Sequence, residues 1–125
     1  MDAVKLERCT VAIIAILTIA TGAAQIAIPN HLLPLLAIDP TALGAHLLAT
    51  VGMFMMLFGG LVLHARKAPD RARFALLWGG LQKFGAAIFV AWGVSRGVLV
   101  PLALAVAAFD FLSALLFLDL RRRGG

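Results

Sequence analysis

Two apolar segments joined by a tight turn constrain this chain more than any other feature. They run from Leu76 to Leu118, meet at Ser95-Arg96-Gly97, and carry one deep charge each, Lys83 and Asp110. Both charges stand at matching distances from the turn, so an antiparallel helical hairpin places both at ~20 Å from it, near the middle of a ~30 Å hydrocarbon layer. A lone charge there costs at least ~3 kcal/mol, which predicts that the two side chains pair.

Composition places the chain among membrane proteins. Hydrophobic residues make up 62% and charged residues 14% of 125 residues, against roughly 45–50% and 25% in soluble domains. A chain of this length predicts a single domain over residues 1–125. The net charge of +5 comes from short basic clusters at the ends of apolar runs, so we expect no nucleic-acid partner.

Four apolar runs are long enough to cross a membrane. They cover residues 10–28 and about 43–64, 74–94 and 98–120. Pro101 suits the first turn of the fourth helix, and Trp78 and Trp92 stand near the ends of the third, as interfacial anchors do. The sequence therefore predicts an all-α fold, a bundle of four transmembrane helices.

The basic residues predict the orientation. Nine of the eleven fall on one side of the predicted spans, whereas Arg96 falls on the other and Lys83 lies within a span. The positive-inside rule then places both termini and the connector between the second and third spans in the cytoplasm, with anionic lipid headgroups as partners at that face. The nine are Lys5, Arg8, Arg66, Lys67, Arg71, Arg73, Arg121, Arg122 and Arg123.

The connector over residues 29–42 and the second span have distinct patterns. Three prolines exclude a spanning helix in the connector, so we expect a short segment at the membrane interface or in the mouth of the bundle. Asp39 or Thr41 is expected to cap the next helix. Ala45, Gly52 and Gly59 recur every seven residues and predict a small-residue face against which another helix packs closely.

Polar residues around the two deep charges form a candidate site. Gln82 with Lys83 on the third span, and Asp110 with Ser113 on the fourth, predict a polar cluster inside an apolar bundle. Three interpretations stay open: a structural lock that fixes helix register, a ligand site, and a proton relay. A secondary polar layer of Gln25 and His46 is predicted toward the outer side.

Motifs for catalysis or metal binding are absent from the sequence. His31, His46 and His64 have no metal-ligand spacing, and the single Cys9 excludes an internal disulfide. There is no nucleophile motif and no phosphate-binding glycine loop. We therefore expect neither enzymatic activity, nor a metal, nor a cofactor.

Three stretches have the look of family signatures: residues 52–60, residues 77–87, and Phe109-Asp110-Phe111-Leu112-Ser113. With the four short spans, they resemble the small four-helix bacterial membrane proteins of the DoxX-like group. The resemblance implies a four-helix bundle in the inner membrane, sometimes a subunit beside redox or respiratory proteins, and it carries no catalytic residues over. The length also resembles the small multidrug resistance transporters, but those place a glutamate inside the first span, and Glu7 precedes it here.

The resulting prediction is a multi-pass protein of the bacterial inner membrane without catalysis of its own. It acts as an accessory subunit or binds a lipid or quinone-like small molecule, alone, as a homo-oligomer or with a membrane protein partner. The alternative is a proton-coupled small-molecule transporter that uses Asp110 and Lys83. No motif in the sequence identifies the ligand or the partner.

Overall fold

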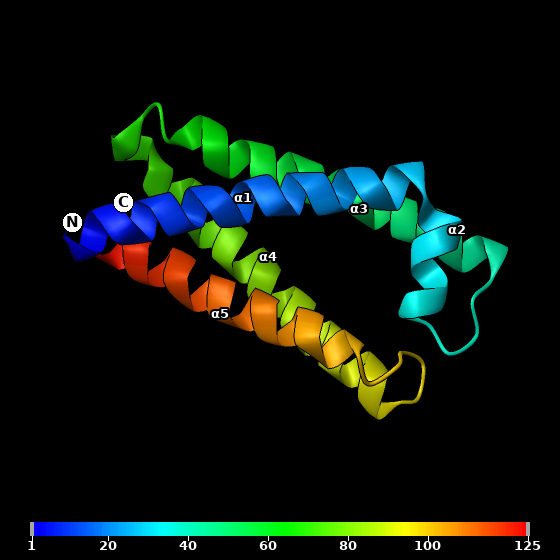
Figure 1. Ribbon diagram of the computed structural model, residues 1–125. Helices are drawn as coiled ribbons and strands as arrows, with labels where there is room; N and C mark the ends of the chain where they lie inside the picture. The colour runs from blue at the N-terminus through cyan, green and yellow to red at the C-terminus, as the bar shows by residue number, and fades with distance from the viewer. Residues whose placement is uncertain (1, 125) are drawn as a thin grey trace.

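The computed structural model describes residues 2–124, and all the regular structure in that range is helical. Four of the helices are long and apolar enough to cross a membrane, which confirms the predicted all-α bundle of four membrane-spanning helices (Figure 1). The elements are α1 (Ala3–Ala27), α2 (Pro29–Leu32), the 3-10 turn η1 (Leu33–Leu35), α3 (Ala42–Ala65), α4 (Pro69–Ser95) and α5 (Ala103–Arg122).

The long helices form two pairs, α1 with α3 and α4 with α5 (Figure 1). Both ends of the chain lie at one end of the bundle, together with the α3–α4 turn. We call this the basic end, because the nine basic residues predicted to share one side belong to it. The connector with α2 and the α4–α5 turn lie at the opposite end, which we call the far end.

The predicted small-residue face of the second span is confirmed. Ala45, Gly52 and Gly59 are all buried in α3, and the two glycines contact α1. A Cβ atom added at Gly59 would lie 2.7 Å from the side chain of Ile19 and 2.8 Å from the carbonyl oxygen of Ala15. The absence of side chains at these positions is what lets the two backbones approach.

Two of the long helices, α1 and α3, begin at a side-chain cap. At the start of α1, the carboxylate of Asp2 accepts a hydrogen bond from the backbone N–H of Lys5 at 2.8 Å. Of the two caps expected for α3, the structure uses Thr41, whose hydroxyl oxygen accepts from the N–H of Gly44 at 2.9 Å. These two caps satisfy backbone donors in the first turns of α1 and α3.

The first and third helices begin earlier than predicted, at Ala3 and Pro69, and the predicted start of the fourth span is wrong. The fourth span was expected to begin at Val98 with Pro101 in its first turn, but α5 begins at Ala103 and Pro101 precedes it. The intervening residues instead pair with the connector: the N–H of Ile38 donates to the carbonyl of Val98 at 3.1 Å, and the N–H of Val100 donates to the carbonyl of Leu36 at 2.7 Å. These bonds attach the first helix pair to the second at the far end, and they occupy backbone groups that a helix would use.

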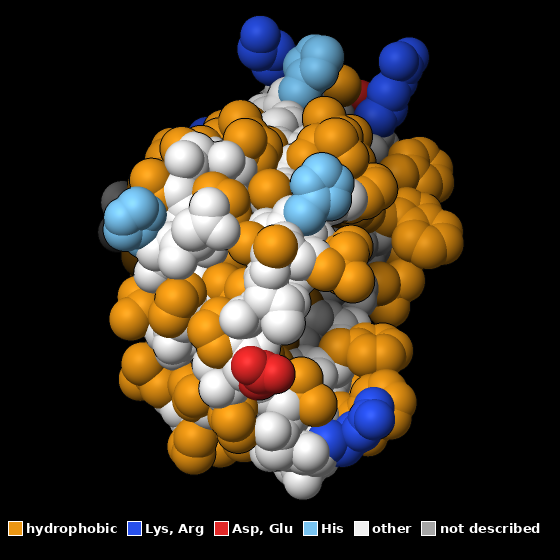
Figure 2. All heavy atoms as spheres, turned by 90° about the vertical axis from the view of Figure 1, so that its right-hand side faces the viewer, with side chains coloured by type: hydrophobic (Ala, Val, Ile, Leu, Met, Phe, Trp, Pro, Cys, Tyr) orange, Lys and Arg blue, Asp and Glu red, His pale blue; other side chains and the backbone are white. Residues whose placement is uncertain are grey.

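Burial is uneven along the bundle. The core cluster of large apolar side chains includes Val11, Val62, Leu76, Phe117 and Leu120, and it joins all four long helices. Outside it, many large apolar side chains are exposed, and hydrophobic side chains gather along both edges of the view from the far end (Figure 2). An exposed apolar surface of this extent is unfavourable in water and suits lipid surroundings.

Candidate functional site

The two deep charges lie in contact. The Lys83 ammonium on α4 donates a hydrogen bond to Oδ1 of Asp110 on α5 across 3.2 Å. The Lys83 side chain is 4% exposed and that of Asp110 is 14% exposed. The ammonium nitrogen also lies 5.7 Å from the centre of the Phe109 ring, close enough for a cation–π attraction. Lys83 thus has one carboxylate partner and one aromatic neighbour in a mostly apolar setting.

Close packing of α4 on α5 brings these side chains together. One turn before Lys83, a Cβ atom at Gly79 would lie 3.1 Å from the Phe117 ring, and one at Gly80 would lie 3.0 Å from Leu118. The two glycines leave room for bulky residues of α5 at this level. The contact therefore forms even though α5 begins later in the chain than the sequence predicted.

The other two members of the predicted polar cluster are Gln82 and Ser113. Gln82 is half-buried, and Ser113 is buried on α5, one turn after Asp110. Gln82 and Lys83 line a cavity of about 10 Å³ that also touches Thr18 of α1. A cavity of that size holds about one water molecule. The cluster therefore has no room for a larger ligand at this point.

Thr18 is a neighbour of the cluster that the sequence did not point to. It is buried, and its hydroxyl donates to the carbonyl of Ile14 at 2.8 Å. A hydroxyl bonded inside its own helix costs little in an apolar span. The only sequence signal was a threonine in the middle of the first apolar run, and nothing marked which helix it would face.

The two residues of the predicted secondary polar layer have different surroundings. Gln25 is buried on α1, and its side-chain amide donates to the sulfur of Met55 at 3.4 Å. Its carbonyl oxygen is buried without a hydrogen-bond partner among the described residues. His46 lies exposed on α3. No hydrogen bond in the described part of the chain joins the two, so a shared layer stays a prediction.

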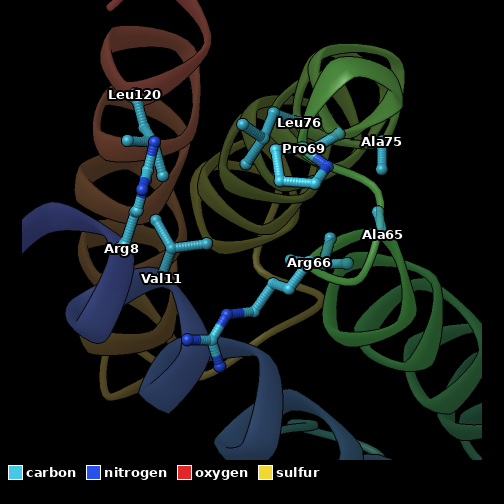
Figure 3. Close-up of a pocket in the computed structure, with 10 residues that line it drawn as sticks. Arg8, Val11, Ala65, Arg66, Pro69, Ala75, Leu76 and Leu120 are labelled. Carbon is cyan, nitrogen blue, oxygen red and sulfur yellow. The ribbon is translucent and has the colours of Figure 1, made fainter. Parts of the chain in front are cut away.

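A larger cavity, which no sequence pattern predicted, opens at the basic end. Its volume is about 160 Å³. Figure 3 shows Arg8 on α1 and Arg66 directly after α3, together with apolar side chains from α4 and α5 around the same space. The lining consists of Arg8, Val11, Val62, Ala65, Arg66, Pro69, Ala72, Ala75, Leu76 and Leu120.

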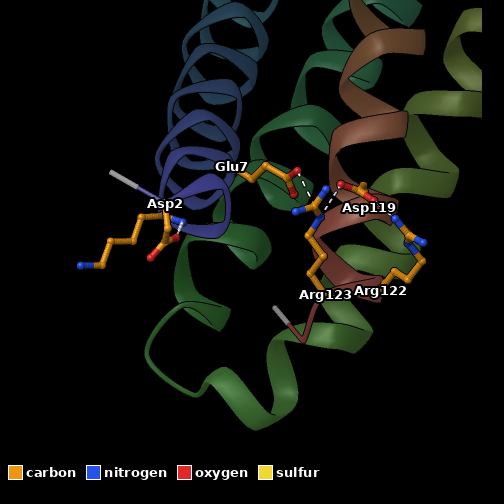
Figure 4. A network of polar contacts seen from close by, with 6 residues as sticks. Asp2, Glu7, Asp119, Arg122 and Arg123 are labelled. Atoms are coloured by element: carbon orange, nitrogen blue, oxygen red, sulfur yellow. Dashed lines mark hydrogen bonds and ion pairs between the residues drawn. The ribbon is translucent and has the colours of Figure 1, made fainter.

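An ion-pair network lies at the same end and links the two ends of the chain (Figure 4). The Arg123 guanidinium lies 2.9 Å from Asp119 on α5 and 3.5 Å from Glu7 on α1. Arg122 pairs with Asp119 at 2.8 Å. The carboxylates thus neutralise two of the three C-terminal arginines and hold α1 beside α5.

Within residues 2–124, no group of three or more histidine, cysteine, aspartate or glutamate side chains is arranged to hold a metal ion. Cys9 is exposed on α1. No family model, no curated protein and no solved structure matches this chain.

Proposed function

We propose that the protein is an accessory protein of the bacterial inner membrane without catalysis of its own. It acts by binding a membrane protein partner or a small apolar molecule such as a lipid or a quinone-like compound. In this proposal the basic end faces the cytoplasm, in keeping with nine basic residues at that end and Arg96 alone at the other. The resemblance to the DoxX-like group is consistent with a subunit of this kind.

The observation that supports the proposal best is that the polar cluster leaves no room for a ligand. Lys83 and Asp110 contact each other at 3.2 Å, and the space beside Lys83 is only about 10 Å³. A substrate-binding centre needs an opening of several hundred Å³ for a drug-sized molecule. We therefore assign Lys83 and Asp110 the role of an intramembrane ion pair that fixes α4 and α5 in register.

The competing proposal is a proton-coupled transporter that uses the same two residues. The water-sized cavity that Lys83 shares with Thr18 and Gln82 is the observation in its favour, because a proton relay needs water or hydroxyl groups beside a titratable side chain. However, Asp110 lines neither of the two cavities described above. The accessory role needs no such path, and the geometry favours it.

The test is purification of the full-length protein from its native membrane in a mild detergent, followed by mass spectrometry of the bound lipids, quinones and proteins. We expect one lipid, quinone or protein to co-purify at near-stoichiometric amounts. Recovery of the bare chain, together with proton-coupled uptake by liposomes that contain only this protein, would contradict the accessory role and favour the transporter.

A further inference from the structure

The cavity at the basic end combines a charged opening with an apolar interior. Val11, Val62, Leu76 and Leu120 line it and belong to the buried core of the bundle. Arg8 and Arg66 are exposed and line it as well. In Figure 3 the Arg66 side chain extends toward α1, and that of Arg8 extends toward Leu120 on α5. The space thus presents basic groups and an apolar surface to one molecule.

The charges around the cavity are not balanced from within the chain. Arg122 and Arg123, at the same end, pair with Asp119 and Glu7. By contrast, neither Arg8 nor Arg66 forms a salt bridge within the described residues. The acidic residues nearest to them in sequence, Glu7 and Asp70, do not line the cavity.

The volume of the cavity limits the size of the group that can enter it. A cavity of about 150 Å³ in another protein holds one benzene ring, and this one is about 160 Å³. It therefore admits one small group rather than a complete lipid. An amphiphile with its anionic group at the arginines and a short apolar part inside matches both the size and the charge.

We propose that this cavity binds an anionic phospholipid of the leaflet at the basic end. Arg8 and Arg66 hold its phosphate, and the glycerol and first methylene groups lie against Val11 and Leu76. Basic pockets between transmembrane helices recognise lipid headgroups in this way. The assignment rests on the proposed binding function and names its ligand class.

The test uses the full-length protein in a neutral detergent, titrated with phosphatidylglycerol or with phosphatidylcholine of the same acyl chains. Native mass spectrometry reports the lipid that each protein retains. We expect the wild type to prefer phosphatidylglycerol. Arg8→Gln and Arg66→Gln should each weaken its binding about fivefold, and the double variant about 25-fold. Arg71→Gln, which removes an exposed basic side chain of the same end outside the cavity, is the matched control and should bind as the wild type does.

A second variant tests the apolar part of the site. Ala65→Leu adds bulk to the cavity at a half-buried position and keeps both arginines. It should weaken phosphatidylglycerol binding without changing the unfolding temperature of the lipid-free protein. Inorganic phosphate at the lipid concentration should not compete. Competition by phosphate, or unchanged binding by Ala65→Leu, would reduce the cavity to a simple anion site and overturn the lipid proposal.

The failures of the two proposals are distinguishable. Equal binding of both lipids by the wild type, or equal effects of Arg71→Gln and Arg8→Gln, would overturn the phospholipid site. The proposed accessory function would survive that result if the native preparation carries a quinone or a protein partner. The accessory function would be contradicted only if the purified protein, without any partner, transports a substrate.

Discussion

Gly22 and Gly52 bring the backbones of α1 and α3 into direct contact. A Cβ atom added at Gly52 would lie 2.5 Å from the carbonyl oxygen of Gly22 and 2.8 Å from the Cβ of Gln25. No side chain fits between these atoms, so the pairing of the first two spans depends on glycine at this crossing. The contact lies on the face that also buries Ala45 and Gly59.

The first prediction concerns this face. Gly52→Leu and Gly59→Leu should each destabilise the protein by about 1–3 kcal/mol or more, because the added bulk forces α3 away from α1. Thermal or denaturant unfolding in detergent measures the loss. Gly60→Ala is the matched control, since a Cβ there meets nothing within 4 Å, and it should leave stability unchanged or slightly raised. Unchanged stability of both leucine variants would mean that this face meets lipid.

The small-residue face could be predicted because its period of seven residues is visible within the sequence of a single helix. Its partner could not be, since Gly22 stands in an apolar run with no matching repeat. The start of α5 was misplaced for a related reason. The hydropathy of residues 98–102 suits a helix, but their backbone groups bond to the connector, and such long-range pairing leaves no local signal.

The second prediction concerns the link between α1 and α5 at the basic end. Arg123→Gln removes the guanidinium that lies within reach of both Glu7 and Asp119. It should lower the unfolding temperature slightly in dilute salt and not at all near ~1 M salt, where the Debye length falls to about 3 Å. Arg122→Gln removes an ion pair inside α5, so its salt-dependent loss is the reference for a pair that does not join two helices, and the loss in Arg123→Gln should be larger. Equal salt dependence of the wild type and Arg123→Gln would contradict a stabilising link.

The third prediction concerns orientation. A reporter fused after residue 125 should read cytoplasmic, and one inserted near Asp39 should read external, because nine of the eleven basic residues belong to the end that holds the termini. Paired fusions to a phosphatase and a fluorescent protein make the measurement in intact cells. A cytoplasmic signal at both positions would be incompatible with four spans in the proposed orientation.

Only part of the candidate site could be predicted from the sequence. Lys83 and Asp110 could be matched because both belong to one hairpin, where distance from a turn measures depth. The cavity between Arg8 and Arg66 could not, since its lining comes from all four long helices. The position of the cavity depends on how the two helix pairs pack against each other. No periodic pattern in the sequence predicts that packing.

The central claim is that Lys83 and Asp110 stabilise the bundle as a pair and have no separate chemical role. Removing one partner leaves the other charge nearly buried, at 4% or 14% exposure, so each single loss should be worse than the loss of both. A charge swap, Lys83→Asp with Asp110→Lys, should also be tolerated if pairing alone matters.

The most direct measurement is a double-mutant cycle on unfolding in bicelles with Lys83→Met, Asp110→Leu and the double variant. We predict that each single change lowers the free energy of unfolding by about 3 kcal/mol or more, and that the double change recovers much of that loss. Losses that simply add in the double variant would contradict the pair. A stable double variant that no longer binds its ligand would instead assign these two residues to the functional site.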